Sequence, residues 1–577
     1  MGQLLIGFIF CLLVILLITT EINASLLFIG AVCVCLFLGF IDTNQLLDSF
    51  TNEALIALIL LLQVSAVIER SAFIPILSRQ IFVPGKRGWS IFRMSSLSII
   101  LSSHLNNTAV VASLMGIIQS NKHFVPSKFL IPLSYSAIMG GVLTLIGTST
   151  NLIINSFMVE EGMEPLGFYD FIYVGIPLVL IGGIYLLLIL PRLLPYNTMD
   201  EEEEEKKFFL EVRVSQKSRL IGKSIEENGL RNMDHLFLAE IIRNNQLISP
   251  VTPDEKLEER DRLVFTGDIN QIQELRKFDG LEILEEGMDD ILKSNLQEVV
   301  IRHNSPVIGR KIKDAQFRTK FDAVVVALNR GKEDISGKLG QVVLRPGDSL
   351  VLAVGQEFAK HQNISQNFIL ISPVEAESAY NFRESYLAVG IFLLSIVMVA
   401  FQVMSLLKAM LLDIFIFLIL GLLKTKDLKN NLNLPLFLMI GSSLGLSKVL
   451  VNQGIASKIG MNIINLTGMD NPYLTLFGIY ITTVVLTELV TNSAAAALVF
   501  PIALVTANQL NVSPMPFIMI IAYAASASFM TPIGYQTNTM VWSVGKYKFT
   551  DYIKAGTPLA ILYGIVVMLL VPYFFPF

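Results

Sequence analysis

The chain has 577 residues, of which 53% are hydrophobic and only 16% are charged, and its formal net charge is −5. A soluble globular protein carries about 25% charged residues, so this composition is typical of a membrane protein rather than a soluble one. The small net charge gives no indication of a nucleic-acid partner, and we expect none. The three cysteines lie in apolar stretches and predict no disulfide framework.

Apolar residues are clustered in runs that are nearly or fully free of charge. These runs cover residues 4–18, 24–37, 55–68, 171–190, 387–403 and 555–571. Segments of roughly 17–25 apolar residues are long enough to cross a bilayer as helices, so we expect an all-α, multi-pass protein of the cell membrane. No basic region precedes the first run, and a second run follows at once. We therefore expect a retained first helix rather than a cleaved signal peptide.

The composition divides the chain into three parts. We expect membrane halves at residues 1–195 and 381–577, with a non-membrane insert between them. Pro191 and Pro195 end the last helix of the first half, and a solvated acidic linker, 196–206, follows.

The insert contains two copies of one sequence motif. Residues 211–214, 220–225 and 257–265 of the first copy match 298–301, 307–312 and 344–352 of the second. The offset is constant, since 298 − 211, 309 − 222 and 348 − 261 are each 87. Short alternating strands separated by turn residues predict a β-rich α+β domain for each copy.

This pattern, with L-x-G-K/R-x-I after the first strand and a late G-D-x-L-V strand, resembles the RCK-C (TrkA-C) regulatory domain. The resemblance places the two copies at 207–285 and 290–375. It implies that both copies lie in the cytoplasm and regulate the attached transporter, and that they could bind a small ligand that the sequence does not identify. We expect the insert to modulate transport without forming part of the anion site.

The two membrane halves resemble each other at two polar islands each. The first pair is SSHLNNTAV at 102–110 and TELVTNSAA at 487–495. The second pair is TLIGTSTN at 144–151 and TPIGYQTN at 531–538. Polar interruptions at matching places in two halves are typical of inverted-repeat transporters.

The islands predict a binding site because a polar side chain in hydrocarbon must find a partner. Glycine, and proline at Pro532, favour unwound segments, which membranes tolerate only inside protein or around a cavity. Hydroxyl and carbonyl oxygens suit sodium, whereas amide donors and helix N-termini suit an anion. The islands contain no Lys or Arg, so a co-bound cation would supply the missing positive charge.

Isolated polar residues have a simpler interpretation. Ser136 or Thr482 alone would bond to its own helical turn. His104 and Glu488 are the ionisable groups nearest the islands, and either a structural role or the handling of ions or protons would explain them.

The islands carry a second resemblance, to the divalent anion/sodium symporter family (DASS). Residues 106–108 and 491–493 are similar to its paired Ser-Asn-Thr signatures, and residues 526–538 and 147–151 are similar to its later motifs. Asn106 and Thr491 replace Ser, and Ser493 replaces Thr, whereas Asn107 and Asn492 match.

The resemblance implies a homodimer with an elevator-type motion. Each protomer would have about 11 spanning helices and two re-entrant hairpins. The implied sodium ligands are Ser102, Asn106, Asn107 and Gly147 at one site and Thr487, Asn492 and Gly534 at the other. The implied anion ligands are Asn106, Asn107, Thr108, Thr148, Thr491, Asn492, Ser493 and Thr537.

The sequence therefore predicts a sodium-coupled symporter of a small divalent oxyanion. Sulfate is the first candidate and a C4-dicarboxylate the second, and an anion or metalloid efflux antiporter is a further alternative. A gated potassium channel would need a Thr-Val-Gly-Tyr-Gly filter, which the chain lacks. No nucleophile–base pair or metal-ligand cluster stands out, so we expect no enzyme.

The expected topology starts in the cytoplasm. Six spans before the insert would place the N-terminus and the insert together in the cytoplasm. Five spans after it would leave Phe577 outside.

Overall fold

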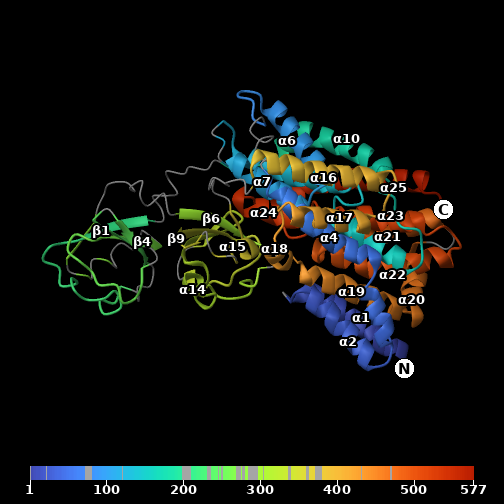
Figure 1. The fold of residues 1–577 in the computed structure, drawn as a ribbon, viewed down its shortest axis with the longest axis horizontal. Coiled ribbons are helices and arrows are strands. Elements are labelled where there is room, and N and C mark those ends of the chain that lie inside the picture. Colours follow the sequence, from blue (N-terminus) through green and yellow to red (C-terminus); the bar gives the residue numbers. More distant parts are fainter. Residues whose placement is uncertain are drawn as a thin grey trace.

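The computed structural model resolves the chain into a helical part and an insert of two β-sheets (Figure 1). It describes residues 2–20, 22–71, 81–119, 121, 123–197, 209–230, 236–244, 246–248, 251–267, 275, 278, 280–283, 296–302, 305–335, 339–355, 357–358, 361, 363–370, 380–430, 432–467 and 471–577. Most of the predicted acidic linker, 196–206, lies outside these residues.

The helices of the first half run from the N-terminus to the insert. They are α1 (Gly2–Thr19), α2 (Ala24–Phe37), α3 (Thr43–Phe50), α4 (Glu53–Glu69), α6 (Arg87–Ser102), α7 (Asn107–Gln119), the short η1 (Pro126–Lys128), α8 (Leu130–Gly141), α9 (Ser149–Glu160), α10 (Ile172–Leu188) and α11 (Leu190–Leu193).

The helices of the second half follow the insert. They are α16 (Phe382–Ala400), α17 (Leu406–Ile419), α18 (Thr425–Asn430), α19 (Leu434–Asn452), α20 (Ile455–Thr467), α21 (Pro472–Leu489), α22 (Asn492–Gln509), α23 (Met515–Ser526), α24 (Gln536–Val544) and α25 (Phe549–Phe574).

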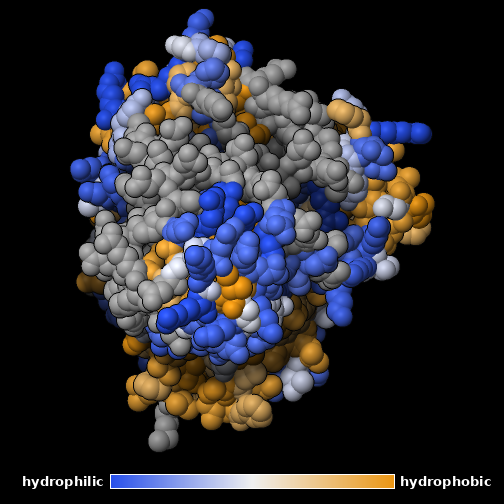
Figure 2. Space-filling model, turned by 90° about the vertical axis from the view of Figure 1, so that its left-hand side faces the viewer, coloured by the Kyte–Doolittle hydropathy of each residue, from blue (hydrophilic) through white to orange (hydrophobic). Residues whose placement is uncertain are grey.

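The helical part has the properties of a multi-pass membrane protein. Within the described residues, six helical stretches are long and apolar enough to cross a bilayer, and several shorter apolar helices accompany them. Large apolar side chains face outward along these helices, with Leu180 62%, Leu394 63% and Leu569 67% exposed. Water would make this surface unfavourable, whereas lipid matches it. Figure 2 shows hydrophilic residues gathered on the insert, with hydrophobic surface on the helical part around it.

The polar islands coincide with breaks between helices, as the sequence predicts. In the first half, α6 ends at Ser102 and α7 begins at Asn107; in the second, α21 ends at Leu489 and α22 begins at Asn492. The later islands separate α8 from α9 and α23 from α24. Each half therefore contains a helix pair with a polar tip, followed by a helix interrupted at a second polar segment.

The insert forms two five-stranded antiparallel sheets. The strands of the first are β1 (Phe209–Val214), β2 (Leu236–Arg243), β3 (Gln246–Ile248), β4 (Arg262–Gly267) and β5 (Leu281–Ile283). The strands of the second are β6 (Leu296–Ile301), β7 (Ala323–Arg330), β8 (Glu333–Ile335), β9 (Ser349–Val354) and β10 (Phe368–Leu370). Short helical segments, η3 (Ile312–Asp314), α14 (Phe317–Phe321), η4 (Leu339–Gln341) and α15 (Ile364–Asn367), accompany the second sheet.

The two sheets have the same topology. The orders are β3-β2-β4-β1-β5 and, read from the other edge, β8-β7-β9-β6-β10. Each sheet has its own apolar core, one including Val212 and Leu263 and the other Val299 and Leu350. Each copy of the sequence motif thus folds around its own core.

An ion pair recurs at the same place in both copies. Arg243 Nε donates to Asp261 Oδ1 at 2.9 Å, and Arg330 Nε donates to Asp348 Oδ1 at 2.6 Å. Both carboxylates are buried, and a second guanidinium nitrogen bonds each of them. Since 330 − 243 and 348 − 261 are both 87, the offset found in the sequence is also the offset between equivalent contacts.

Helix α4 fixes which end of the helical part faces the insert. Its last residue, Glu69, interacts electrostatically with Arg302, which follows β6. At the other end of α4, the Asn52 side chain donates to Glu160 at 2.8 Å. Glu160 and the insert therefore lie at opposite ends of α4, and α4 lies in a stretch that is long and apolar enough to cross a membrane.

The N-terminus lies on the side away from the insert. Lys448 pairs with Glu160 at 2.5 Å, and α19, which contains Lys448, ends four residues later. Just beyond α19, Lys458 donates to the Gln3 side chain at 2.8 Å. Figure 1 accordingly shows both termini at the end of the helical part distant from the sheets.

The N-terminus and the insert thus lie at opposite ends of the helical part, which does not agree with the prediction that they share one side of the membrane. The chain turns back between α6 and α7 at a polar tip, where the family resemblance implies a re-entrant hairpin. The prediction that Phe577 lies opposite the insert agrees with Figure 1.

This arrangement predicts the same behaviour for reporters at both chain ends. A reporter that is active only in the cytoplasm should be active when it replaces the 198–208 segment and inactive when fused to Gly2 or Phe577. Measuring reporter activity at constant expression would test this. An active reporter at one chain end and an inactive one at the other would contradict it.

Candidate functional site

The tip of the α6–α7 pair is closed by a hydrogen bond between two buried side chains. Ser102 Oγ donates to Asn107 Oδ1 at 2.5 Å, and Asn107 is the first residue of α7. Gly141, at the end of α8, faces the Asn107 amide so closely that an added Cβ would lie 2.7 Å from Nδ2. A side chain at Gly141 would therefore displace Asn107.

The segment between α8 and α9 folds against this tip. Thr144 Oγ1 donates to the Ser103 carbonyl at 2.5 Å and accepts from the Gly147 N–H at 3.2 Å. The Asn151 side chain donates to the Thr144 carbonyl at 2.9 Å. Gly147 stacks on the Gly141 backbone with no room for a Cβ. We refer to Ser102, Ser103, Asn107, Thr144, Gly147 and Asn151 as the first cluster.

The α21–α22 tip repeats the first contact. Thr487 Oγ1 lies 2.9 Å from Asn492 Oδ1 and 2.6 Å from the Ala525 carbonyl oxygen. Thr487 is fully buried, and Asn492 is the first residue of α22. A hydroxyl and an amide oxygen thus lie side by side at the start of a helix, as they do at Ser102 and Asn107.

The segment between α23 and α24 repeats the contacts that the α8–α9 segment makes in the first half. Thr531 Oγ1 accepts from the Gly534 N–H at 3.0 Å, and the Asn538 side chain donates to the Thr531 carbonyl at 3.2 Å. Thr531 Oγ1 also donates to Glu488 Oε2 at 2.6 Å, and the Met530 N–H donates to Glu488 Oε1 at 2.9 Å. We refer to Thr487, Glu488, Asn492, Thr531, Gly534 and Asn538 as the second cluster.

The two clusters match position by position. Since 487 − 102 and 492 − 107 are both 385, and 531 − 144, 534 − 147 and 538 − 151 are all 387, the same contacts recur at nearly constant offsets. One position differs in chemistry: Glu488 corresponds to Ser103, so a carboxylate receives the threonine hydroxyl where the first half offers a backbone carbonyl.

Tyr535 connects the two halves. It follows Gly534 of the second cluster, and its hydroxyl accepts from Asn107 Nδ2 at 2.7 Å and lies 3.4 Å from Thr148 Oγ1. The two halves therefore meet at their polar segments rather than through apolar packing alone.

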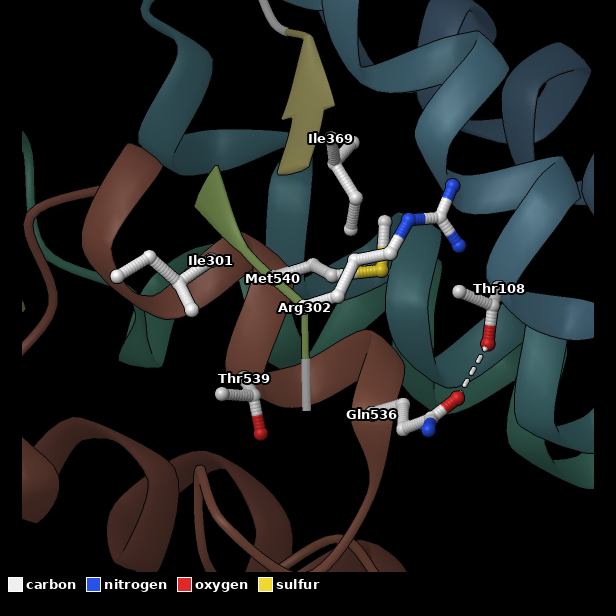
Figure 3. Close-up of a pocket in the computed structure, with 7 residues that line it drawn as sticks. All are labelled: Thr108, Ile301, Arg302, Ile369, Gln536, Thr539 and Met540. Atoms are coloured by element: carbon white, nitrogen blue, oxygen red, sulfur yellow. Dashed lines mark hydrogen bonds between the residues drawn. The ribbon is translucent and has the colours of Figure 1, made fainter. Parts of the chain in front are cut away.

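A pocket lies beside the first tip, between the helices and the insert (Figure 3). Thr108, Ile301, Arg302, Ile369, Gln536, Thr539 and Met540 line it. Thr108 Oγ1 donates to Gln536 Oε1 at 3.0 Å across it. Figure 3 shows the Arg302 side chain extending from the end of β6 past Met540 toward Thr108. The insert thus contributes residues to a pocket that also contains residues of the polar islands.

Several other predicted site residues make hydrogen bonds to nearby groups of the protein. Asn106 is exposed, and its Oδ1 accepts from the Thr108 N–H at 2.8 Å, while Thr491 caps α22 by accepting from the Ala494 N–H at 3.3 Å. Thr537 is fully buried, and its Oγ1 accepts from Ser134 Oγ at 2.8 Å. Ser493, in the first turn of α22, is partly buried. The roles predicted for these side chains remain predictions.

The simpler interpretations of isolated residues are borne out in two cases. Ser136 donates to the Pro132 carbonyl and Thr482 to the Gly478 carbonyl, each within its own helix. His104 Nδ1 lies 2.7 Å from Ser103 Oγ, which favours a structural role.

Comparison with known proteins identifies the family. The model of the citrate transporter family, CitMHS, matches residues 14–507 and, in a second match, 396–577. The chain belongs to the citrate transporter family. It is accordingly a transporter and not an enzyme.

Relatives extend over the whole chain. A Chlamydomonas reinhardtii protein named as a sulfur deprivation response regulator is 31% identical over 96% of this chain and 99% of its own length. An uncharacterized transporter of Synechocystis is 29% identical over 93% of this chain and 91% of its own length. Sodium/sulfate cotransporter 1 of Chlamydomonas reinhardtii is 28% identical over 64% of this chain and 43% of its own length. This member of the citrate transporter family therefore has relatives that share the insert-containing length.

Within this family member, sequence reasoning missed three side chains at the site. Tyr535 and Gln536 lie inside a recognised island, but a tyrosine hydroxyl linking the halves has no sequence signal. Arg302 lies far from every island in the sequence. A comparison of the two copies of the insert could have indicated Arg302, because the matching position in the first copy, 87 residues earlier, is Ser215.

Proposed function

We propose that the chain is a sodium-coupled symporter of a small divalent oxyanion, with sulfate as the first substrate. The observation that carries this proposal is the pair of matching polar clusters at helix breaks, joined across the two halves by Tyr535. A transporter needs such a site at membrane depth, where unwound backbone and polar side chains are otherwise costly.

The chemistry of the clusters supports sodium. Ser102, Asn107, Thr487 and Asn492 place hydroxyl and amide oxygens next to each other, and sodium, a hard cation, takes oxygen ligands. Asn151 Oδ1 is buried and has no hydrogen-bond donor among the described residues, so it retains its capacity to bind a cation. Relatives named as sodium/sulfate cotransporters support the same coupling. One of them, sodium/sulfate cotransporter 2 of Chlamydomonas reinhardtii, is 29% identical.

The choice of sulfate as substrate is supported by the names of the relatives and by the helix N-termini at the site. The sodium/sulfate cotransporters match 62–64% of this chain, whereas a sodium-dependent dicarboxylate transporter of Staphylococcus saprophyticus matches only 24% of it at 30% identity. Helices α7 and α22 begin at Asn107 and Asn492, and helix N-termini favour anions. A C4-dicarboxylate is the second candidate, and efflux by an antiporter of the same superfamily is the alternative direction.

The insert is proposed to be a cytoplasmic pair of RCK-C domains that regulates transport. Its repeated five-stranded topology and repeated Arg–Asp pairs support two copies of one domain. The homodimer, the elevator motion and the anion-ligand roles of Asn106, Thr148, Thr491, Ser493 and Thr537 come from the resemblance to the divalent anion/sodium symporters and are proposed on that basis.

Uptake into proteoliposomes tests this function. We expect labelled sulfate to accumulate when sodium is high outside, and not when potassium replaces it, with succinate and citrate accumulating less. Accumulation of succinate or citrate in place of sulfate would refute the substrate. Equal uptake in potassium would refute sodium coupling, and export driven by an opposing cation gradient would favour the antiporter.

A further inference from the structure

The pocket beside the first tip contains one charged side chain among its described lining residues, and that side chain comes from the insert. Arg302 shares this pocket with Thr108 and Gln536. It is anchored by its own backbone, whose N–H donates to the Asn367 carbonyl at 2.9 Å, and by its Nε, which lies 3.3 Å from the Phe368 carbonyl oxygen. The guanidinium is therefore held at the end of the second sheet, directed toward the tip (Figure 3).

Two helix N-termini converge on the same pocket. Gln536 is the first residue of α24, and Thr108 is the second residue of α7. The positive ends of both helices thus add to the charge of Arg302. Thr108 supplies a hydroxyl donor and Gln536 supplies amide donors. The Thr108 hydroxyl now donates to the Gln536 side chain, and it could donate to a ligand instead. A guanidinium, two helix N-termini and neutral donors together suit an oxyanion.

The second copy of the insert is fitted to α24 by two glycine turns. Ser543, near the end of α24, accepts from the Gly331 N–H at 3.1 Å and donates to the Gly347 carbonyl at 2.5 Å. A Cβ on Gly331 would lie 2.9 Å from the Tyr547 carbonyl oxygen, and one on Gly347 would lie 2.9 Å from the Thr539 carbonyl oxygen. A side chain at either turn would therefore push the sheet away from α24.

The first copy carries side chains at the same two turns. Positions 87 residues earlier are Asn244 and Arg260, and both are exposed. All four residues have positive φ, 49° and 66° in the first copy and 58° and 79° in the second, so the backbone turns correspond. The second copy thus has glycine at the two turns that touch α24, and it has Arg302 where the first copy has Ser215.

Glu69 is the other charged group that acts on Arg302. Burial lowers the pKa of the Arg302 guanidinium, and the charge of Glu69 opposes that effect. Among the described residues, Glu69 at the end of α4 is the carboxylate whose charge acts on this guanidinium. An arriving dianion offers Arg302 a stronger negative charge than Glu69 does.

We propose that Arg302 of the insert, together with Thr108 and Gln536, forms an oxyanion-binding subsite beside the transport site, so that the insert takes part directly in substrate capture. The subsite serves the anion of the proposed function and rests on it. It replaces the sequence-based expectation that the insert only modulates transport. Docking of the Gly331 and Gly347 turns on α24 keeps Arg302 in place.

Substitution of Arg302 in the full-length protein tests the subsite by sulfate uptake. Arg302→Ala should raise the KM for sulfate about tenfold, because it removes charge-assisted hydrogen bonds. The sodium concentration for half-maximal uptake, measured at saturating sulfate, should not change. Arg302→Lys should recover part of the affinity. Arg310→Ala, at an exposed position of the same copy, is the matched control and should behave as the unchanged protein.

Substituting Gly331 tests whether Arg302 must be correctly placed, because Arg302 itself is kept. Gly331→Asn introduces the residue that the first copy has at this turn and should raise the KM for sulfate although Arg302 is intact. Gly309→Asn is its control, since Gly309 also has positive φ but nothing lies within 4 Å of an added Cβ. A normal KM in Gly331→Asn would refute the role of docking.

An unchanged KM for sulfate in Arg302→Ala would overturn the subsite. If the maximal rate also rose at that unchanged KM, Arg302 would be a latch of the insert. Sulfate-induced thermal stabilisation of the purified protein provides a readout that does not need transport. If the unchanged protein were stabilised by sulfate and Arg302→Ala were not, without sodium-driven uptake by either, the proposed function would fail and the subsite would stand.

Discussion

Replacing Asn107 or Asn492 with aspartate is expected to lower the affinity for the anion by roughly several hundred-fold or more. Asn107 Oδ1 accepts from Ser102, and its Nδ2 donates to the Tyr535 hydroxyl, so the amide uses both of its ends. An aspartate keeps the acceptor, loses the donor and adds a negative charge. Two like charges about 4 Å apart cost roughly 4 kcal/mol at an effective dielectric near 20.

Sodium dependence should respond in the opposite direction. The added carboxylate attracts the cation, so the sodium concentration for half-maximal uptake should fall or stay constant while the KM for the anion rises. Measuring both quantities for each variant separates this effect from a general loss of activity.

Asn471→Asp is the matched control for Asn492→Asp. Asn471 caps α21, the helix that precedes α22, and its Oδ1 accepts from the Tyr473 and Leu474 N–H groups. Aspartate caps a helix as well as asparagine does, and the residue is exposed, so the same substitution here should leave the anion KM unchanged. Normal transport by both Asn107→Asp and Asn492→Asp would show that the islands are not the anion site.

Much of the helical part could be predicted because polar residues in hydrocarbon are energetically costly. Such residues are therefore rare in apolar segments, and clusters of them are easy to recognise in the sequence. Ser102, Asn107, Thr487 and Asn492 were found as members of matching islands, and the structure brings each pair into contact. The two resemblances between halves fixed which residues correspond before any contact was known. The repeated strands of the insert were found for a related reason, since a constant offset survives where individual residues change.

The side of the N-terminus could not be predicted in the same way. Hydropathy measures how apolar a segment is and does not say on which side of the membrane the chain begins. The family resemblance implies the turn at Leu105 and Asn106, but not how α8 packs against the α6–α7 pair. That packing involves Gly140 and Gly141, whose lack of side chains brings α8 within contact of the tip.

Arg302 and Tyr535 illustrate contacts that composition cannot reveal. The absence of Lys and Arg from the islands predicts a site without protein cations, whereas Arg302, at the edge of the site, comes from another part of the chain. Comparing the two copies of the insert would have indicated Arg302, Gly331 and Gly347 as departures from Ser215, Asn244 and Arg260. Nothing in the sequence, however, says that these departures lie on one face and that α24 covers it.

Removing the hydroxyls of Ser102 and Thr487 is expected to impair sodium binding rather than anion binding. Each hydroxyl oxygen lies next to the amide oxygen of its cluster, at 2.5 Å for Ser102 and 2.9 Å for Thr487. Loss of one neutral ligand to a cation costs about 2 kcal/mol, by analogy with a hydrogen bond to a charged group. Ser102→Ala and Thr487→Ala should therefore raise the sodium concentration for half-maximal uptake about 30-fold.

Conservative and matched variants decide whether the hydroxyl oxygen itself is responsible. Thr487→Ser and Ser102→Thr keep the oxygen and should retain sodium dependence close to that of the unchanged protein. Thr482→Ala, on the same helix as Thr487, removes a hydroxyl that bonds only its own turn and should change nothing beyond stability. The measurement is sulfate uptake as a function of sodium at saturating sulfate. Unchanged sodium dependence in both Ser102→Ala and Thr487→Ala would refute the two cation sites, because each variant removes an oxygen from its cluster without adding charge.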